Sequence, residues 1–510
     1  MRKQMKRWER DSEGNFGPLY PIKRLLMTLK PAITLGIFLL LFTSCGQPVR
    51  KQADCYGALE TSAKATTVQT VSGPVAGYID DGVFIYKGIP YARADRFQPA
   101  VDPEPWTEVR SSRAYGPTCP QDKRTGWYSD AQAFSMHWDD GFPDEDCLRV
   151  NVWTGGINDG GKRPVMVWLH GGGFCAGSGQ ELISYDGTNL ARDHGVVVVT
   201  LNHRLNVLGF LDLSAYGAKY AHSGNLGMMD IVKALEWVRD NIANFGGDPS
   251  NVTVFGQSGG GGKVCTLMAM PSAKGLFGKA IVESGSITDL MIPKYSRRVG
   301  AATVQNLGLN PSRIDDMADV PYETLLRAYN QALKAVSEEA REDGAMPENF
   351  LNALLFGQVP VVDGEIIPAQ PGTPEALALS KDIPTIIGTT YHEFTRDRED
   401  PIFKPLAVRQ ATDRTAAGCA PVYLYRFVWQ SPVLDGALGS THCLEIPFVF
   451  DNVLLHRTFT GGGEEAVELG HRISRLWTSF ARTGKPEAAG MPEWEPWPRT
   501  LVLDTASKLE

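Results

Sequence analysis

The chain has 510 residues, 43% of them hydrophobic, and a formal net charge of −8 at pH 7. This length and apolar content are enough to bury a large core, in one large α/β domain or in up to three smaller ones. No long basic run lies outside the N-terminus. This argues against a nucleic-acid partner, because phosphate binding needs a clustered positive face.

The N-terminal residues are typical of a targeting segment. A lysine precedes an apolar run from about Ala32 to Phe42, which is shorter than a membrane-spanning helix of ~20 residues and matches the core of a signal peptide. The residues "LFTSC" at the end of this run resemble a bacterial lipobox, whose cysteine is lipidated and becomes the mature N-terminus. We therefore expect a lipid anchor on Cys45, with a plain secretory signal as the alternative and Met27 as a second candidate start.

These features divide the chain into three predicted parts: a targeting segment over 1–45, a flexible tether over 46–67, and a single domain over 68–510. The tether is polar and has no hydrophobic periodicity. The anchor predicts a lipoprotein of a bacterial cell envelope, on its periplasmic or surface side. None of the eight cysteines has C-x-x-C spacing, so we expect no metal site.

Apolar runs alternate with helical patterns beyond the tether. Continuous apolar runs predict strands over 164–170, 195–203, 251–256 and 383–388. Helical spacing appears over 228–245 and again from 466, and Gly484 and Pro486 supply the stop signal of the second segment. The continuous apolar runs are typical of strands that are covered on both faces of a sheet. The pattern therefore predicts an α/β fold with a mostly parallel central sheet flanked by helices.

A serine followed by four glycines comes directly after the third predicted strand. Gly256, Ser258 and Gly260 form the motif G-x-S-x-G, and the mostly apolar residues 262–270 predict a helix behind it. This strand–turn–helix context is the one in which the motif marks a nucleophile. The turn holds the hydroxyl clear of the sheet, and the helix N–H groups face an anion that forms beside it. We therefore predict Ser258 as the nucleophile of acyl transfer.

A second glycine run, "HGGGF" over 170–174, ends the first predicted strand. Glycines after a strand let consecutive backbone N–H groups face a carbonyl oxygen. We predict that Gly172, Gly173 and Gly259 donate to the oxyanion. A phosphate-binding loop is the alternative. The absence of a Walker lysine, and of G-x-G-x-x-G with a later acid, argues against it.

The nucleophile needs a histidine base and an acid, which follow it in this chain order. The histidines downstream are His392, His442, His456 and His471. His471 lies in an amphipathic helix and His456 lies among apolar residues, so both are expected to be structural. Spacing alone leaves His392 and His442 open as the base. It also leaves the acid open among Glu393, Asp397 and Glu399.

Together these segments resemble the type-B carboxylesterases, the cholinesterase-like family of α/β-hydrolases. The resemblance runs from about Gly73 to the C-terminus and includes "YKGIPYA" over 86–92, "EDCLRVNVW" over 145–153 and the nucleophile segment. It implies an α/β-hydrolase fold and a serine carboxylesterase that acts on a small-molecule ester without a cofactor.

The resemblance also implies individual roles. "IIGTTYHEF" matches the family segment that carries the acid and places it at Glu393, and "GSTHCLEIPFVFDN" places the base at His442. A cysteine in the position of Cys147 usually pairs with one a short way upstream, where Cys119 stands. The resemblance therefore implies a disulfide between these two residues.

Three departures from the family pattern bear on activity. Gln257 stands where many members carry Glu, which argues against a quaternary-ammonium substrate, and Gly259 stands where Ala is commoner. Only 48 residues separate Glu393 from His442, fewer than the family normally has. A catalytically silent, cholinesterase-like binding protein is therefore one alternative function. Hydrolysis of another acyl bond, such as an amide, a thioester or a glycan-borne acyl group, is another.

Overall fold

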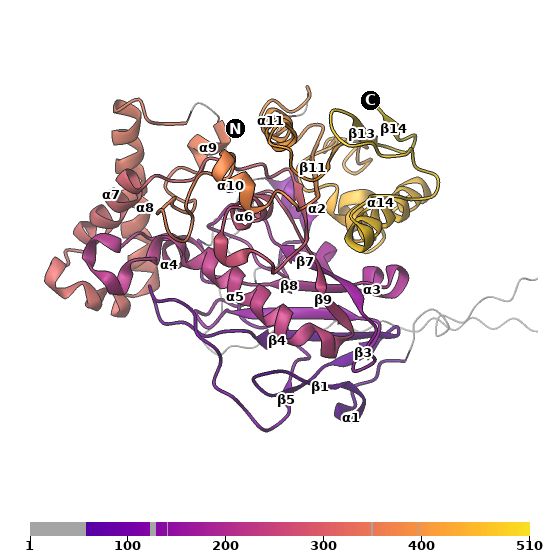
Figure 1. Cartoon of the computed structure of the whole chain (residues 1–510), viewed down its shortest axis with the longest axis horizontal. Helices are drawn as coiled ribbons and strands as arrows, with labels where there is room; N and C mark the ends of the chain where they lie inside the picture. Colours follow the sequence, from indigo (N-terminus) through magenta and orange to yellow (C-terminus); the bar gives the residue numbers. More distant parts are fainter. Residues whose placement is uncertain (1–57, 123–128, 140, 348–349, 396) are drawn as a thin grey trace, which may run out of the picture. The chain divides into compact units, whose positions relative to one another are not determined.

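Eleven strands form one sheet through the middle of the described part of the chain (Figure 1). The computed structural model describes residues 58–510 except 123–128, 140, 348–349 and 396. From one edge to the other, the strands are β14 (Lys508–Leu509), β13 (Thr500–Leu503), β12 (Val422–Phe427), β11 (Thr385–Thr390), β10 (Lys279–Glu283), β9 (Gly247–Gln257), β7 (Arg163–Leu169), β8 (Val197–Leu201), β6 (Arg149–Thr154), β4 (Val83–Pro90) and β3 (Tyr78–Asp80). The strands from β13 to β8 run parallel, and antiparallel pairs complete both edges.

Helices cover both faces of this sheet. The helices are α1 (Ala63–Thr66), α2 (Asp130–Met136), α3 (Thr188–His194), α4 (Asn206–Phe210), α5 (Leu226–Asn241), α6 (Gly259–Leu267), α7 (Pro293–Asn306), α8 (Tyr322–Glu342), α9 (Phe350–Leu354), α10 (Pro374–Leu379), α11 (Phe403–Ala416), α12 (Ile446–Val449), α13 (Arg457–Thr460) and α14 (Glu464–Thr483). Figure 1 shows α3 and α14 on one side of the central strands and α5 and α6 on the other. Helices α7 and α8 pack against each other farther out.

The side chains of the central strand β7 alternate between two apolar cores, which is why the predicted strands are unbroken apolar runs in the sequence. Val165 and Val167 belong to the core beneath α5 and α6, whereas Met166 and Trp168 belong to the core beneath α14. Alternate side chains of one strand point to opposite faces, so both faces of a doubly covered sheet must be apolar. The predicted α/β fold with a mostly parallel, helix-flanked sheet is confirmed.

The folded region begins before the predicted boundary between residues 67 and 68. Glu60 exchanges two backbone hydrogen bonds with Ile79, at 2.9 and 2.8 Å, and α1 follows it. Strand β1 (Thr67–Gln69) then starts a small second sheet with β2 (Pro74–Ala76) and β5 (Arg110–Ser111). The last residues of the predicted tether are therefore part of the domain. The targeting segment and Cys45 lie outside the described residues.

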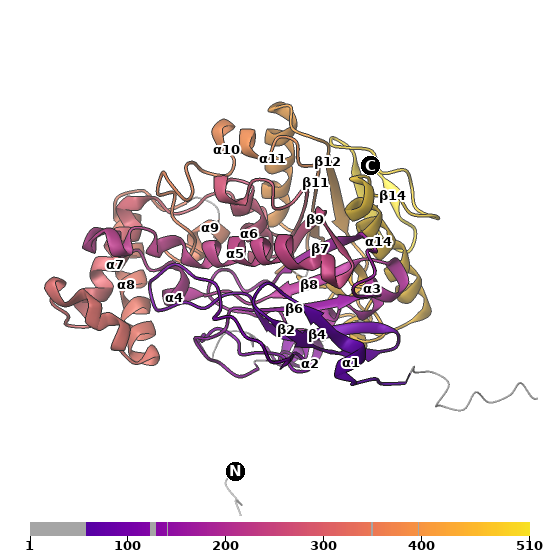
Figure 2. The same cartoon turned by 60° about the horizontal axis from the view of Figure 1, so that its bottom comes forward.

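The short interval between Glu393 and His442 does not interrupt the sheet. It contains α11 and β12, and β12 pairs with both of its neighbours, β11 and β13. Asp400 caps the start of α11, since its carboxylate accepts hydrogen bonds from the N–H groups of Ile402, Phe403 and Lys404. Figure 2 shows α11 beside β11 and β12. The shortened segment is thus built into the fold.

The predicted disulfide between Cys119 and Cys147 is not formed in this structure, which has both residues as buried free thiols. Cys119 Sγ accepts a hydrogen bond from the N–H of Leu205 at 3.3 Å. A hydrogen bond with Cys119, together with burial, raises the pKa of the Cys147 thiol. The two thiols are therefore neighbours, and their oxidation stays a prediction for the exported protein. No helix of the described region is long and apolar enough to span a bilayer.

Candidate active site

The predicted site residues follow four parallel strands of the sheet. The glycine loop follows β7, Ser258 follows β9, Glu393 comes three residues after β11, and His442 lies in the loop after β12. Because the carboxyl ends of parallel strands meet at one edge of a sheet, this topology brings all four loops to the same edge.

Ser258 occupies a strained turn between β9 and α6. Its φ of 57° and ψ of −123° lie in a region that non-glycine residues rarely adopt. The N–H of Ser258 donates to the carbonyl of Glu283 at 2.8 Å, which ties the turn to the end of β10. A Cβ at Gly260 would lie 1.9 Å from the carbonyl oxygen of Leu169, so the turn can pass β7 only with glycine there.

The glycine loop after β7 lies directly against the start of α6. Gly172 and Gly173 have positive φ angles of 80° and 62°. A Cβ at Gly259 would lie 2.1 Å from the Gly173 carbonyl oxygen and 2.5 Å from its Cα. The three glycines predicted to donate to an oxyanion therefore come from two segments in close contact.

Glu393 and His442 are joined by a hydrogen bond between Oε2 of the acid and Nδ1 of the imidazole. The other carboxylate oxygen, Oε1, accepts from Ser284 Oγ at 2.7 Å and from the N–H of Thr390 at 2.8 Å. The backbones are tied as well, since the N–H of His442 donates to the Glu393 carbonyl at 3.2 Å. Glu399, one of the two other acid candidates, pairs instead with cations on the surface. Of the candidates that spacing left open, the structure pairs Glu393 with His442.

The imidazole of His442 lies between aromatic rings and an amide. The ring centroids of Phe394 and Phe403 are 4.6 and 5.1 Å from that of His442. Gln257 Nε2 lies 3.2 Å from His442 Nε2, and no hydrogen bond joins Ser258 to His442 among the described residues. Gln257 Nε2 lies almost as close to His442 Nδ1, at 3.3 Å, so the amide lies over the ring and not along the lone pair of Nε2. Hydrogen bonds between a nucleophile and its base often tighten only when substrate binds.

The other downstream histidines have structural contacts. His456 is buried, contacts Ser184 Oγ at 2.6 Å, and has a pKa lowered by burial to about 4. His471 pairs with Asp451. His392 Nδ1 accepts from the N–H of Ser440 at 2.9 Å, which fixes the turn that carries His442. This supporting role of His392 was not predicted from the sequence.

Two further carboxyl groups are buried beneath the acid. Ser284 Oγ, which donates to Glu393, also lies 3.4 Å from Glu445 Oε1. Burial, with the nearby charges of Glu283 and Glu393, raises the pKa of Glu445 well above its usual value. Burial also raises the pKa of Glu283 to about 8, although its Oε1 accepts from Trp477 Nε1 at 2.7 Å. The protonated form of each carboxyl group is therefore favoured, and Glu283, with a pKa of about 8, is mostly protonated at neutral pH.

We expect Glu283→Gln to stabilise the protein at neutral pH but not in acid. Glu283 stays protonated up to about pH 8 when folded, whereas in the unfolded chain it ionises above about pH 4.5. The wild type therefore loses stability as pH rises through this window, by about 1.4 kcal/mol per unit. Urea unfolding should show the variant gaining on the order of 2 kcal/mol over wild type between pH 5 and pH 7. Glu104→Gln, at an exposed ion pair, is the control, and equal gains for both variants would contradict the prediction.

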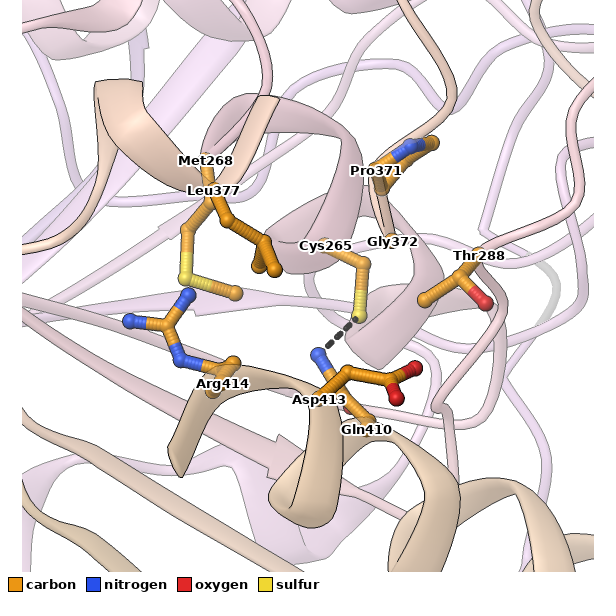
Figure 3. A pocket seen from close by; sticks show the side chains of 9 residues that line it. All are labelled: Cys265, Met268, Thr288, Pro371, Gly372, Leu377, Gln410, Asp413 and Arg414. Atoms are coloured by element: carbon orange, nitrogen blue, oxygen red, sulfur yellow. Dashed lines mark hydrogen bonds between the residues drawn. The ribbon is translucent and has the colours of Figure 1, made fainter. Parts of the chain in front are cut away.

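A small cavity lies between α6 and α11 (Figure 3), and neither Glu393 nor His442 lines it. Gln410 Nε2 points into it and donates to Cys265 Sγ at 3.2 Å. Its volume of about 10 Å³ is that of roughly one water molecule, so it cannot hold an ester. Within the described region, no group of three His, Cys, Asp or Glu side chains is arranged to hold a metal ion.

Comparisons with known proteins agree with this geometry. A model of the carboxylesterase family matches residues 64–401 and 398–508. The para-nitrobenzyl esterase of Bacillus subtilis (strain 168) is 38% identical over 497 residues, which cover 87% of this chain and 96% of that protein. The phenmedipham hydrolase of Pseudarthrobacter oxydans is 32% identical and covers 83% and 91%.

Solved structures give the same result. A thermophilic PNB esterase superposes with a TM-score of 0.75 at 34% identity, covering 88% of this chain and 97% of that one. An esterase from Clostridium hathewayi that can hydrolyse aliphatic aromatic polyesters has a TM-score of 0.77 at 33% identity, covering 87% and 95%. The two family matches meet at 398–401, just after Glu393, which is where the interval to His442 is short. The chain therefore belongs to the type-B carboxylesterase family of α/β-hydrolases, and it hydrolyses carboxylic esters.

Proposed function

We propose that this esterase works through an acyl-enzyme on Ser258, with His442 as general base and Glu393 as the acid that orients it. The observation that supports this is the hydrogen bond between His442 Nδ1 and the buried carboxylate of Glu393, at the sheet edge where Ser258 occupies a strained turn. Glu393 keeps the proton of the neutral ring on Nδ1. Nε2 is then the nitrogen that accepts the proton of the Ser258 hydroxyl.

The reaction follows from these positions. Ser258 Oγ attacks the ester carbonyl while His442 Nε2 takes its proton, and the carbonyl oxygen becomes an oxyanion. The backbone N–H groups of Gly172, Gly173 and Gly259 donate to that oxyanion. His442 then protonates the leaving alcohol, and the carbon–oxygen bond to it breaks. Water, deprotonated by His442, attacks the acyl-enzyme and releases the acid and free Ser258. No step needs a cofactor.

The proposed substrates are uncharged, small-molecule esters with an aromatic part. Phe394 is 56% exposed beside the His442 ring and offers an apolar face to such a group. Gln257, next to the nucleophile, is neutral and gives no attraction to a cationic alcohol. Two relatives support the same class of aromatic esters: one is a para-nitrobenzyl esterase, and the other can hydrolyse aliphatic aromatic polyesters. Turnover of 4-nitrophenyl acetate, butyrate and octanoate should exceed that of butyrylthiocholine, and the reverse order would overturn this assignment.

Covalent labelling tests the nucleophile directly. A fluorophosphonate should add one phosphonyl group per chain, on the peptide that contains Ser258, because the adduct places its oxygen in the oxyanion hole. Intact and peptide mass spectrometry measure this stoichiometry and site. Ser258→Ala should take up no label, with Ser286→Ala as a matched control that labels normally. A label on another serine would show that the proposed nucleophile is wrong.

We also propose that the mature protein is an exported lipoprotein anchored through Cys45 to a bacterial cell envelope. The lipobox-like "LFTSC" at the end of the apolar run supports this. Mass spectrometry of the mature N-terminus should find acylated Cys45. An unmodified N-terminus near it would instead indicate a secreted protein.

A further inference from the structure

Lys263 is a buried lysine in the helix that begins at the nucleophile. It lies five residues after Ser258 in α6, and its side chain is inaccessible to solvent. Burying an ammonium group is costly, so such a group normally has hydrogen-bond partners that offset the loss of water. Its partners therefore indicate what the residue does.

The partners of Lys263 belong to the loop of the proposed oxyanion hole. Nζ donates to the carbonyl of His170 at 2.8 Å and makes a longer contact of 3.5 Å to the carbonyl of Gly171. The Gly171 carbonyl belongs to the same peptide group as the N–H of Gly172. A cation on that oxygen makes the N–H a stronger donor, because hydrogen bonds along a peptide chain polarise one another.

The groups around Lys263 come from the strands and loops packed on α6. Glu181 is the anionic side chain that favours its protonated form, and Cys175 is a half-buried thiol of the same glycine loop. The imidazoles of His170 and His203 stack 5.2 Å apart. Burial and the charge of Lys263 lower the pKa of both well below the usual value, so both are neutral. Burial lowers the pKa of Lys263 itself to about 7.

We propose that Lys263 is a positioning residue for catalysis: its ammonium holds and polarises the carbonyls of His170 and Gly171, and so aligns the backbone N–H donors of Gly172 and Gly173 on the oxyanion. The inference rests on the oxyanion hole of the proposed function. It adds a proton-dependent component to that hole. Lys263 loses its charge as pH rises through about 7, and the charge-assisted hydrogen bonds then weaken to neutral ones, without being lost.

Lys263→Met tests this, because methionine fills a similar volume without a charge or a donor. We expect kcat for 4-nitrophenyl butyrate to fall about 10- to 100-fold at pH 6, somewhat less than for a lost oxyanion donor, with KM within about twofold. The ratio of wild-type to variant kcat/KM removes any pH dependence that the two proteins have in common. This ratio should shrink several-fold between pH 6 and pH 8.5 as wild-type Lys263 is deprotonated.

Controls separate this role from a structural one. Lys279→Met removes a half-buried lysine on β10 whose partner is Asn251. The ratio of wild-type to Lys279→Met kcat/KM should not change with pH. If Lys263→Met does not fold, Lys263→Gln replaces it. The glutamine amide keeps a hydrogen-bond donor but carries no charge. The ratio of wild-type to variant kcat/KM should therefore be smaller than for Lys263→Met and should still fall as pH rises.

Two results would overturn the inference in distinguishable ways. If Ser258→Ala is inactive but the Lys263 ratios are near one, or do not change with pH, then Lys263 is structural and the proposed function stands. If Ser258→Ala keeps wild-type activity, the proposed site is wrong, and the role of Lys263 is wrong with it.

Discussion

Replacing Glu393 by glutamine is expected to lower kcat roughly 10³- to 10⁴-fold while the protein stays folded, by analogy with the loss that a serine-protease triad suffers when its acid becomes an amide. Steady-state assays with 4-nitrophenyl butyrate measure kcat of the variant relative to wild type. Thermal unfolding measures whether the fold is kept.

The reason lies in the hydrogen bonds that surround the side chain. Glu393 Oε1 accepts from two donors, Ser284 Oγ and the N–H of Thr390. The amide oxygen of glutamine must take that place, because an NH₂ group there would face the fixed N–H of Thr390. The amide NH₂ then faces His442 Nδ1 and can only donate to it. The ring proton is forced onto Nε2, which can no longer accept the proton of Ser258.

Glu445→Gln is the matched control. Glu445 is buried beside the same Ser284 hydroxyl, and burial raises its pKa well above the usual value, so its uncharged form is favoured and an amide resembles that form. We expect a change in kcat of less than about tenfold, typical of one perturbed neutral hydrogen bond. Equal losses in the two variants would mean that packing beneath the site, and not the tautomer of His442, determines the rate.

The parts of the molecule that were predictable from sequence are those with a local pattern. The apolar run at 164–170 is β7 to within one residue, and the predicted helix stop at Gly484 is the residue that ends α14 in a left-handed conformation. G-x-S-x-G placed Ser258 on a strand–turn–helix, because a strained turn has a short sequence signature. Choosing Glu393 and His442 needed the family resemblance, since their pairing depends on two loops 48 residues apart.

What could not be predicted depends on contacts between distant segments. Lys263 lies in a helix that was expected to be mostly apolar, and its acceptors are backbone carbonyls about 90 residues upstream, which carry no side-chain signal. The contact of Gln257 with His442 and the buried carboxyl groups beneath Glu393 are similar cases. The early start of the domain at Glu60 was missed because backbone pairing with Ile79 needs no apolar periodicity.

Gly259→Ala is expected to lower kcat by roughly 10²- to 10³-fold, the loss that follows removal of one oxyanion donor. The added Cβ would lie 2.1 to 2.5 Å from the backbone O, N and Cα of Gly173, and backbone atoms cannot turn aside as a side chain can. The glycine loop must therefore withdraw from Ser258. Alanine favours the helix itself, so a loss of activity cannot be attributed to α6 unfolding.

The same substitution is informative because alanine is commoner at this position in the family that the chain resembles. A loss here means that the glycine loop of this protein lies closer to the nucleophile helix than a Cβ allows. Gly262→Ala, one turn along α6, is the control, because its Cβ would meet the movable side chains of Ile287 and Phe174. We expect less than about a fivefold change in kcat for it, as for a substitution that its neighbours can accommodate. If Gly259→Ala keeps wild-type kcat, the loop withdraws without cost and its close contact with Gly259 does not set the geometry of the oxyanion hole.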